Sequence, residues 1–253
     1  MKKNLSLFLL FFTGLLLTMP LYAQEIDGSF KQANELYKQR NYQEAEKLYL
    51  QLVKQGSVSG NLYYNLGNVY FKLGLKGKAI LYYEKAKKII PRDKDLTSNL
   101  SFLNSIIEDK VETTKRSFFI KKIKDIYDAF SLKECTIAAS FFYLLLIVFL
   151  IVSFFIQAVR SSARWVAGFL GVLILLFSSF LFGKIYQLKY IKEVVITARE
   201  ATIYYAPSKA EVPAFILHEG LKLGVTKEKE GWYQVRIGDD KGGWVEKDKA
   251  EEI

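Results

Sequence analysis

The feature that most constrains this chain is a unit of 34 residues, 60–93, in which small and aromatic side chains stand at fixed positions. Small residues allow two antiparallel helices to approach closely, larger apolar side chains fill the space between them, and a proline ends the second helix. The eight positions are Tyr63, Leu66, Gly67, Tyr70, Ala79, Tyr83, Ala86 and Pro91. This unit predicts a helical hairpin that stacks on its neighbours.

The spacing resembles the tetratricopeptide (TPR) repeat, whose signature positions are all filled here. Residues 26–59 carry a looser copy, with Ser29 in place of the first aromatic residue and no closing proline. Apolar residues at helical spacing follow over 95–108 and predict a capping helix rather than a third repeat. We therefore expect an all-α TPR domain over 26–109. The resemblance implies protein binding rather than catalysis.

In this family the first helix of each unit lines a concave groove that receives the partner. The resemblance places these side chains there: Phe30, Asn34, Tyr37, Lys38, Tyr64, Asn65, Asn68, Phe71 and Lys72. Asn34 and Asn65 fall where chaperone-binding members hold a peptide's terminal carboxylate, but Phe30 occupies the place of the clamping lysine. An extended or helical segment of a partner is therefore favoured over a carboxylate clamp.

Two uncharged runs, 135–159 and 165–183, follow the helical domain. At about 1.5 Å per residue even the shorter run reaches about 28 Å, close to the ~30 Å hydrocarbon core of a bilayer. We predict two transmembrane helices joined by a short cytoplasmic loop, 160–164. The alternative is a pair of buried core helices. A hairpin of this kind leaves both flanking domains on the same side of the membrane.

Residues 1–23 resemble a secretory signal peptide, with Lys2 and Lys3 before an apolar stretch and Ala23 at the cleavage position. Export predicts a bacterial inner membrane protein with both domains on the periplasmic side. The flank 110–134 is richer in basic residues than the loop, and the positive-inside rule then favours the opposite orientation. We follow the signal peptide, because a translocating N-terminal segment fixes the topology before later charges emerge.

The formal net charge of +10 is unevenly distributed: residues 24–95 hold 13 basic against 8 acidic residues, whereas 184–253 hold 12 of each. An acidic partner surface or anionic lipid explains this excess, and so does the solubility of a lysine-rich helical domain. Nucleic acid is disfavoured by the predicted compartment. In the juxtamembrane linker 110–134, cations alternate with apolar residues over 115–124. This pattern predicts an amphipathic helix in the membrane interface, with a plain linker helix as the alternative.

Beyond the second run the pattern changes to short strands separated by turns, which predicts a small all-β barrel over 193–250. Strand patterns occupy 194–205, 221–225 and 232–237. A turn over 238–242 precedes a last strand.

Residues 201–208 resemble the first conserved block of the bacterial SH3-like family, and Gly231-Trp232 and Gly243-Trp244 resemble its closing strands. In that family such modules bind cell-wall material or peptides, or pack against neighbouring domains. Four aromatic side chains are candidates for a ligand shelf, with a role in the barrel core as the alternative. They are Tyr204, Tyr205, Trp232 and Trp244.

The residues that carry catalysis are scarce. A cysteine peptidase needs a cysteine beside a histidine, and the chain has one of each, Cys135 at a membrane edge and His218 in the small barrel. The same scarcity argues against a Cys/His zinc site and an intramolecular disulfide. The glycine-rich stretch 74–78 lacks the spacing of a phosphate loop and reads as a helix connector. We expect no enzyme, no cofactor and no metal.

The order of signal peptide, TPR pair, membrane hairpin and SH3-like barrel resembles the BatE-like family, the E components of the Bacteroides aerotolerance (Bat) operon. The resemblance implies a multidomain membrane scaffold that acts with von Willebrand factor A domain proteins and a MoxR-type ATPase, in a system linked to oxidative stress and aerotolerance. A second hypothesis is a cell-wall sensor whose SH3-like domain binds peptidoglycan.

Overall fold

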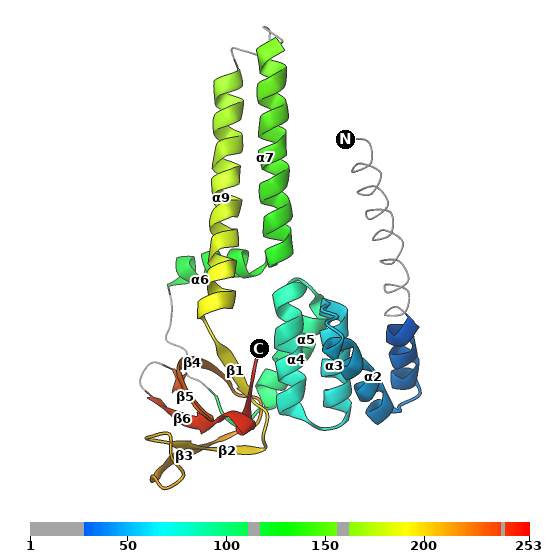
Figure 1. Cartoon of the computed structure of the whole chain (residues 1–253), viewed down its shortest axis with the longest axis vertical. Coiled ribbons are helices and arrows are strands. Elements are labelled where there is room, and N and C mark those ends of the chain that lie inside the picture. Colours follow the sequence, from blue (N-terminus) through cyan, green and yellow to red (C-terminus); the bar gives the residue numbers. More distant parts are fainter. Residues whose placement is uncertain (1–27, 111–116, 156–161, 239–240) are drawn as a thin grey trace, which may run out of the picture.

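The computed structural model describes residues 28–110, 117–155, 162–238 and 241–253. Figure 1 shows a helical domain and a β-domain together at one end of a long helical hairpin. The expected signal peptide, 1–23, lies outside the described residues. So do Lys115 and Arg116 of the linker and the end of the first apolar run, 156–159.

The helical domain consists of stacked antiparallel pairs. Its elements are a helix over 28–38, α2 (Tyr42–Lys54), α3 (Gly60–Lys72), α4 (Lys76–Ile89) and α5 (Lys94–Ile106). Gly67 shows why the signature needs small residues, since a Cβ there would lie 2.4 Å from the ring of Tyr83. The side chains of Ser59 and Asp93 accept hydrogen bonds from the first turns of α3 and α5 and so fix where those helices begin.

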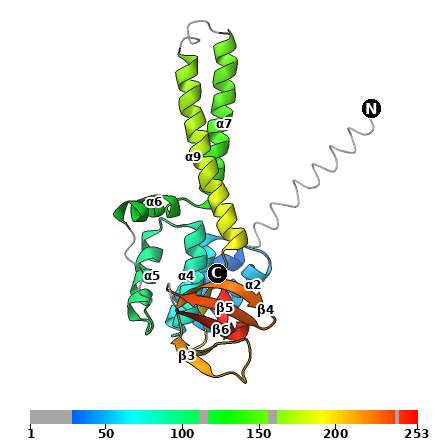
Figure 2. The same ribbon diagram turned by 90° about the vertical axis from the view of Figure 1, so that its left-hand side faces the viewer.

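The two apolar runs form α7 (Leu132–Phe155) and α9 (Ala163–Tyr190), which lie side by side in both views (Figures 1 and 2). Both helices are long and apolar enough to cross a membrane, and only 6% of the most apolar window of each is buried. Neither window is buried in the way that a core helix is. α9 continues past 183 to Tyr190, and the amine of Lys184 lies 4.3 Å from the centre of the Tyr127 ring.

Within the predicted linker, α6 (Phe118–Asp128) lies across the base of the hairpin (Figure 1). Several large apolar side chains of α6 are exposed. They are Phe118, Phe119, Ile120, Ile123 and Ile126. The helix is amphipathic, as the residue pattern indicates, and its insertion into a membrane interface stays a prediction.

The β-domain is a seven-stranded antiparallel sheet in the order β3-β2-β6-β5-β4-β1-β7. Its strands are β1 (Glu193–Ile196), β2 (Glu200–Tyr204), β3 (Pro213–His218), β4 (Lys222–Lys229), β5 (Trp232–Ile237), β6 (Lys241–Glu246) and β7 (Ala250–Glu252), with a 3₁₀ turn, η1 (Lys247–Lys249), before the last. All seven strands contribute to one apolar core, which includes Ile196, Ile203 and Val245. The sheet therefore folds around that core.

The observed strands differ from the predicted pattern in three respects. The stretch 194–205 is two strands rather than one, because β1 pairs with β4 and β7 whereas β2 pairs with β3 and β6. The strands β3 and β7 were missed, since neither shows a clear alternation of apolar and polar residues. The predicted turn 238–242 includes two residues that belong to β6, which begins at Lys241.

The β-domain docks on the helical domain through α4 and β1. The backbone of Gly77, in the first turn of α4, comes so close that a Cβ there would lie 2.6 Å from the carbonyl oxygen of Ile196. The Gly77 N–H donates to the carboxylate of Glu219 at 3.0 Å, so a side chain of the β-domain caps α4. Val195 of β1 is buried within the core of the helical domain. The two domains are therefore in direct apolar contact.

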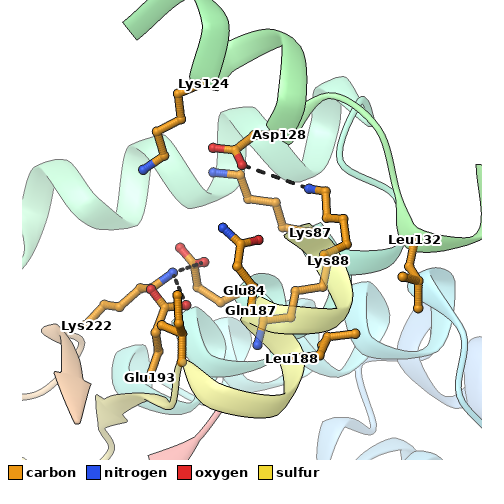
Figure 3. A pocket seen from close by; sticks show the side chains of 12 residues that line it. Glu84, Lys87, Lys88, Lys124, Asp128, Leu132, Gln187, Leu188, Glu193 and Lys222 are labelled. Atoms are coloured by element: carbon orange, nitrogen blue, oxygen red, sulfur yellow. Dashed lines mark hydrogen bonds and ion pairs between the residues drawn. The ribbon is translucent and has the colours of Figure 1, made fainter. Parts of the chain in front are cut away.

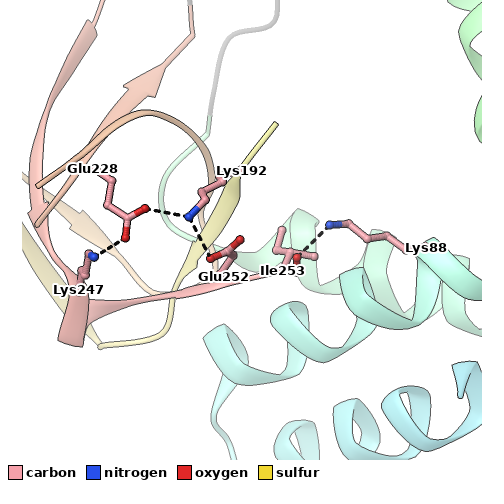
Figure 4. Close-up of polar contacts among 6 residues, drawn as sticks. All are labelled: Lys88, Lys192, Glu228, Lys247, Glu252 and Ile253. Carbon is pink, nitrogen blue, oxygen red and sulfur yellow. Dashed lines mark hydrogen bonds and ion pairs between the residues drawn. The ribbon is translucent and has the colours of Figure 1, made fainter. Parts of the chain in front are cut away.

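A partly buried ion-pair cluster continues this contact. The Lys222 amine of β4 lies 3.0 Å from carboxylates of both Glu84 on α4 and Glu193 on β1. The two carboxylates raise the pKa of Lys222 against the opposing effect of desolvation by burial, which is the largest single influence on it. The amine of Lys88 donates to the backbone carbonyl of Ile253 at 2.9 Å (Figure 4). α4 is thus joined to three separate strands or strand ends.

We expect Gly77→Val to loosen the docking, because the obstructing atoms are backbone atoms that cannot rotate away. The cost should be about 1–3 kcal/mol of unfolding free energy, with faster hydrogen exchange in β1. Gly224→Val in β4 is the matched control, since a Cβ there meets no atom within 4 Å. Equal hydrogen exchange of β1 in both variants would contradict the close contact.

A second cluster joins the strand ends of the β-domain (Figure 4). The Lys192 amine lies 2.8 Å from the Glu228 carboxylate, which also contacts the amine of Lys247. The Lys192 amine lies 3.9 Å from the carboxylate of Glu252. The hydrogen bond from Lys192, followed by that from Lys247, lowers the pKa of Glu228 to about 2. The carboxylate therefore stays charged in the folded protein well into the acid range.

Glu228→Gln should reduce the loss of unfolding free energy that the protein undergoes as the pH falls into the acid range. Because the folded pKa is depressed, the stabilisation by Glu228 is fully present above the ordinary pKa of 4.5 and is lost as the pH falls toward about 2. Tryptophan fluorescence during thermal unfolding, at pH 6 and at about pH 3, measures this, since Trp232 and Trp244 lie in the β-domain. Glu230→Gln is the control. An unchanged pH dependence in Glu228→Gln would contradict the assignment.

Candidate functional site

The first-helix face of the TPR domain holds a polar pocket of about 490 Å³. It is lined by Lys31, Asn34, Glu35, Tyr37, Lys38, Tyr49, Asn65 and Asn68. Five of the nine predicted groove residues meet here, and they come from two successive units. The sequence analysis missed Tyr49, which belongs to the second helix of its unit but reaches the pocket through its hydroxyl.

Asparagines join the stacked helices at the floor of this pocket. The side-chain oxygen of Asn34 accepts a hydrogen bond from the Tyr49 hydroxyl at 2.5 Å and another from the Asn65 amide at 2.8 Å. Burial is the main cause that raises the pKa of Tyr49 to about 12, so its hydroxyl remains a donor at neutral pH. One asparagine thus links its own second helix to the first helix of the next unit.

The same arrangement recurs 34 residues later. Asn68 accepts from the Tyr83 hydroxyl at 2.6 Å and from the Asn99 amide at 3.3 Å. Asn99 lies on α5, which therefore takes the place of a third unit's first helix instead of being only a cap. We call this repeated set the asparagine ladder: Asn34, Tyr49, Asn65, Asn68, Tyr83 and Asn99.

The remaining predicted groove residues form an aromatic continuation of the pocket. Phe30 lies 5.9 Å from Tyr49, and Tyr64 lies 5.8 Å from Tyr83, between ring centres. Phe71 is 37% exposed and meets the ring of Phe102 edge to face at 6.1 Å.

Phe102 is 53% exposed, and the sequence analysis missed it. It stands on α5, 34 residues after Asn68 and 68 after Asn34, so extending the repeat register would have found it. Lys72 stands beside this patch, with its amine 5.9 Å from the centre of the Phe71 ring.

The charges of the pocket do not form a carboxylate clamp. The Asn65 amide nitrogen donates to the Asn34 side-chain oxygen, so one amide atom of each residue is used within the domain and the other is left for a ligand. Lys38 is exposed and pairs with Glu35 at 2.7 Å, which neutralises its charge. The groove therefore offers amide and aromatic groups rather than a concentrated positive charge, and this suits the backbone of a partner segment.

The aromatic candidates of the β-domain lie on its outer surface. Tyr204, Trp232 and Trp244 alternate along their strands with core residues, and all three are half-buried. Tyr204 pairs with Trp244 across β2 and β6 and meets Trp232 edge to face at 5.5 Å. Tyr205, beyond the end of β2, is 71% exposed. Tyr204, Trp232 and Trp244 thus form an aromatic shelf on β2, β5 and β6, away from β1, where the helical domain docks.

The single cysteine and histidine are far apart in the fold. His218 ends β3, where its N–H donates to Asp109 and its ring lies 3.3 Å from the same carboxylate. It thereby ties the β-domain to the segment after α5. Cys135 is buried in the first turn of α7. Among the residues that the structure describes, no group of three His, Cys, Asp or Glu side chains could hold a metal ion.

The asparagine ladder leads to a stability prediction. Asn68→Ala removes the acceptor of a buried tyrosine hydroxyl and should cost about 1–3 kcal/mol. Tyr83→Phe should lower the unfolding free energy by less than Asn68→Ala does. The double variant should lose less than the sum of the two single losses, because both changes remove the same hydrogen bond between Tyr83 and Asn68. Denaturant unfolding measures all three. Asn104→Ala, on the exposed side of α5, is the control. Strict additivity would show that the bond is not made.

Comparison with protein families agrees with this geometry. Residues 30–94 match the tetratricopeptide repeat model, and residues 197–250 match the bacterial SH3 domain model. No curated protein matches the chain significantly. The predictions of a TPR domain and of a bacterial SH3-like domain are thus confirmed, and together these domains point to protein–protein interaction or cell-wall binding.

Proposed function

We propose that the protein is a membrane-anchored scaffold that holds a segment of a partner protein in its TPR groove. The observation that carries this proposal is the open pocket on the asparagine ladder, with the exposed pair Phe71 and Phe102 one helical turn of α3 beyond its lining residue Asn68. Amide groups suit a partner's backbone, and exposed aromatic rings suit its apolar side chains. The protein acts by binding and not as an enzyme.

The proposal includes a place in the cell. α7 and α9 cross the bacterial inner membrane, and the N-terminal segment 1–23 directs export. The TPR and SH3-like domains then stand on the periplasmic side. Support comes from the apolar exposed surfaces of both helices and from the position of both domains at one end of the hairpin (Figures 1 and 2).

The partners that we propose are membrane proteins with von Willebrand factor A domains, in a complex served by a MoxR-type ATPase. The support is the resemblance of the domain order to the BatE-like family. In such a complex the scaffold contributes positioning, and its link to aerotolerance and oxidative stress is indirect.

Purification of the tagged full chain from cross-linked membranes tests the groove. Phe71→Ala with Phe102→Ala should lower recovery of a von Willebrand factor A partner about tenfold, since exposed aromatic anchors often carry more than 1 kcal/mol each. Val58→Ala with Val212→Ala removes exposed apolar side chains away from the groove and should leave recovery unchanged. Equal recovery with both variants would overturn the groove as the binding site.

The aromatic shelf supports a second candidate, a sensor that binds peptidoglycan through the SH3-like domain. Flat aromatic rings on an open sheet surface suit sugar rings. The two candidates separate in one comparison. Retention of the detergent-solubilised chain on isolated sacculi, abolished by Trp244→Ala and unaffected by the Phe71 and Phe102 changes, would favour the sensor.

A further inference from the structure

A second cavity, of about 280 Å³, lies between the helical domain, the β-domain, α6 and the base of the hairpin. Its walls come from α4, α6, the lower ends of α7 and α9, and the strands β1 and β4 (Figure 3). Five lysines face it together with three carboxylates. The lysines are Lys87, Lys88, Lys124, Lys184 and Lys222. The cavity therefore has an excess of positive charge.

All three carboxylates already lie within ion-pairing distance of a lysine amine. Glu84 and Glu193 both pair with Lys222 at 3.0 Å, and Asp128 lies 3.9 Å from the amine of Lys184. Among the described residues, the amines of Lys87 and Lys124 have neither an ion pair nor a hydrogen bond.

Lys88 also lacks a carboxylate within ion-pairing distance, and its amine donates to the carbonyl of Ile253. Burial is the main cause that lowers the pKa of Lys88. A bound anion would compensate this loss of hydration. The unpaired amines and this desolvated one leave the cavity suited to a negatively charged group.

Three apolar side chains also line the cavity, while Lys184 and Gln187 of α9 line it nearer to the apolar part of the hairpin. Leu132 begins α7, while Leu188 and Ile191 lie at the end of α9, where the apolar part of the hairpin gives way to the domains. α6, which supplies Lys124, turns its exposed apolar side chains outward. In a membrane this ring of groups would stand at the level of the lipid headgroups.

We propose that this cavity binds the phosphate of an anionic membrane lipid, with the lipid's chains along α7 and α9. The proposal rests on the membrane anchoring given under the proposed function. A lipid fits better than a soluble anion, because Lys184 of the cavity directly follows the uncharged run 165–183 of α9, along which acyl chains can lie. The bound phosphate would hold α4, α6 and the hairpin in one arrangement and so set the distance of the TPR groove from the membrane.

Lipid titration of the purified full chain in detergent tests this site. Phosphatidylglycerol should raise the temperature of unfolding, and phosphatidylcholine with the same acyl chains should not. Lys87→Glu with Lys124→Glu should weaken the apparent affinity for phosphatidylglycerol about tenfold or more. Lys54→Glu with Lys227→Glu makes the same change in net charge away from the cavity and should stay within about twofold. Lys124→Glu alone, on the surface helix α6, should give a partial loss even if the double variant folds poorly.

Three results would overturn the lipid site. They are equal stabilisation by phosphatidylcholine, equal stabilisation by inorganic phosphate without lipid, and equal loss of affinity in the control variant. The anchoring has a separate readout, since an integral membrane protein stays in the membrane pellet after an alkaline carbonate wash. A chain that resists the wash but shows no preference for phosphatidylglycerol would defeat the lipid site alone, whereas a chain released by the wash would defeat the anchor.

Discussion

The close contact between the first turn of α4 and the strand β1 determines how the other parts are arranged. Gly77 brings two backbones together where a side chain would not fit, and Glu219 supplies the cap that α4 lacks among its own neighbours. Because a second helix of the TPR domain is used for docking, the first-helix face remains open. The same contact places the β-domain beside the base of the hairpin, where the lysine cavity forms.

The asparagine ladder gives the TPR domain its continuity. A bundle of few repeats buries little surface, and additional stacked units are usually needed for stability. Here α5 supplies part of a third unit through Asn99, and the β-domain adds Val195 to the same core. The short array is therefore completed from both sides by elements outside the repeat pattern.

The sequence predicts those parts of the fold that depend on local spacing. The second TPR unit was evident because packing between its helices requires Gly67 and Tyr83 at fixed positions. α5 was less evident as a repeat helix, since Thr97 and Asn104 stand where the signature has aromatic residues. The contact between Gly77 and Glu219 spans 142 positions, and its residue types are common on any surface, so no local pattern could reveal it. For the same reason the groove was predicted in part, while the lysine cavity was not.

Only Ile191 and Lys192 separate the end of α9 from the start of β1. This junction is too short to act as a flexible tether, and β1 is held between β4 and β7 while it packs on α4. A tilt or rotation of the hairpin must therefore move the β-domain and the TPR domain with it. The hairpin, the β-domain and the TPR domain therefore move as one unit, and the orientation of the two apolar helices determines the direction that the TPR groove faces.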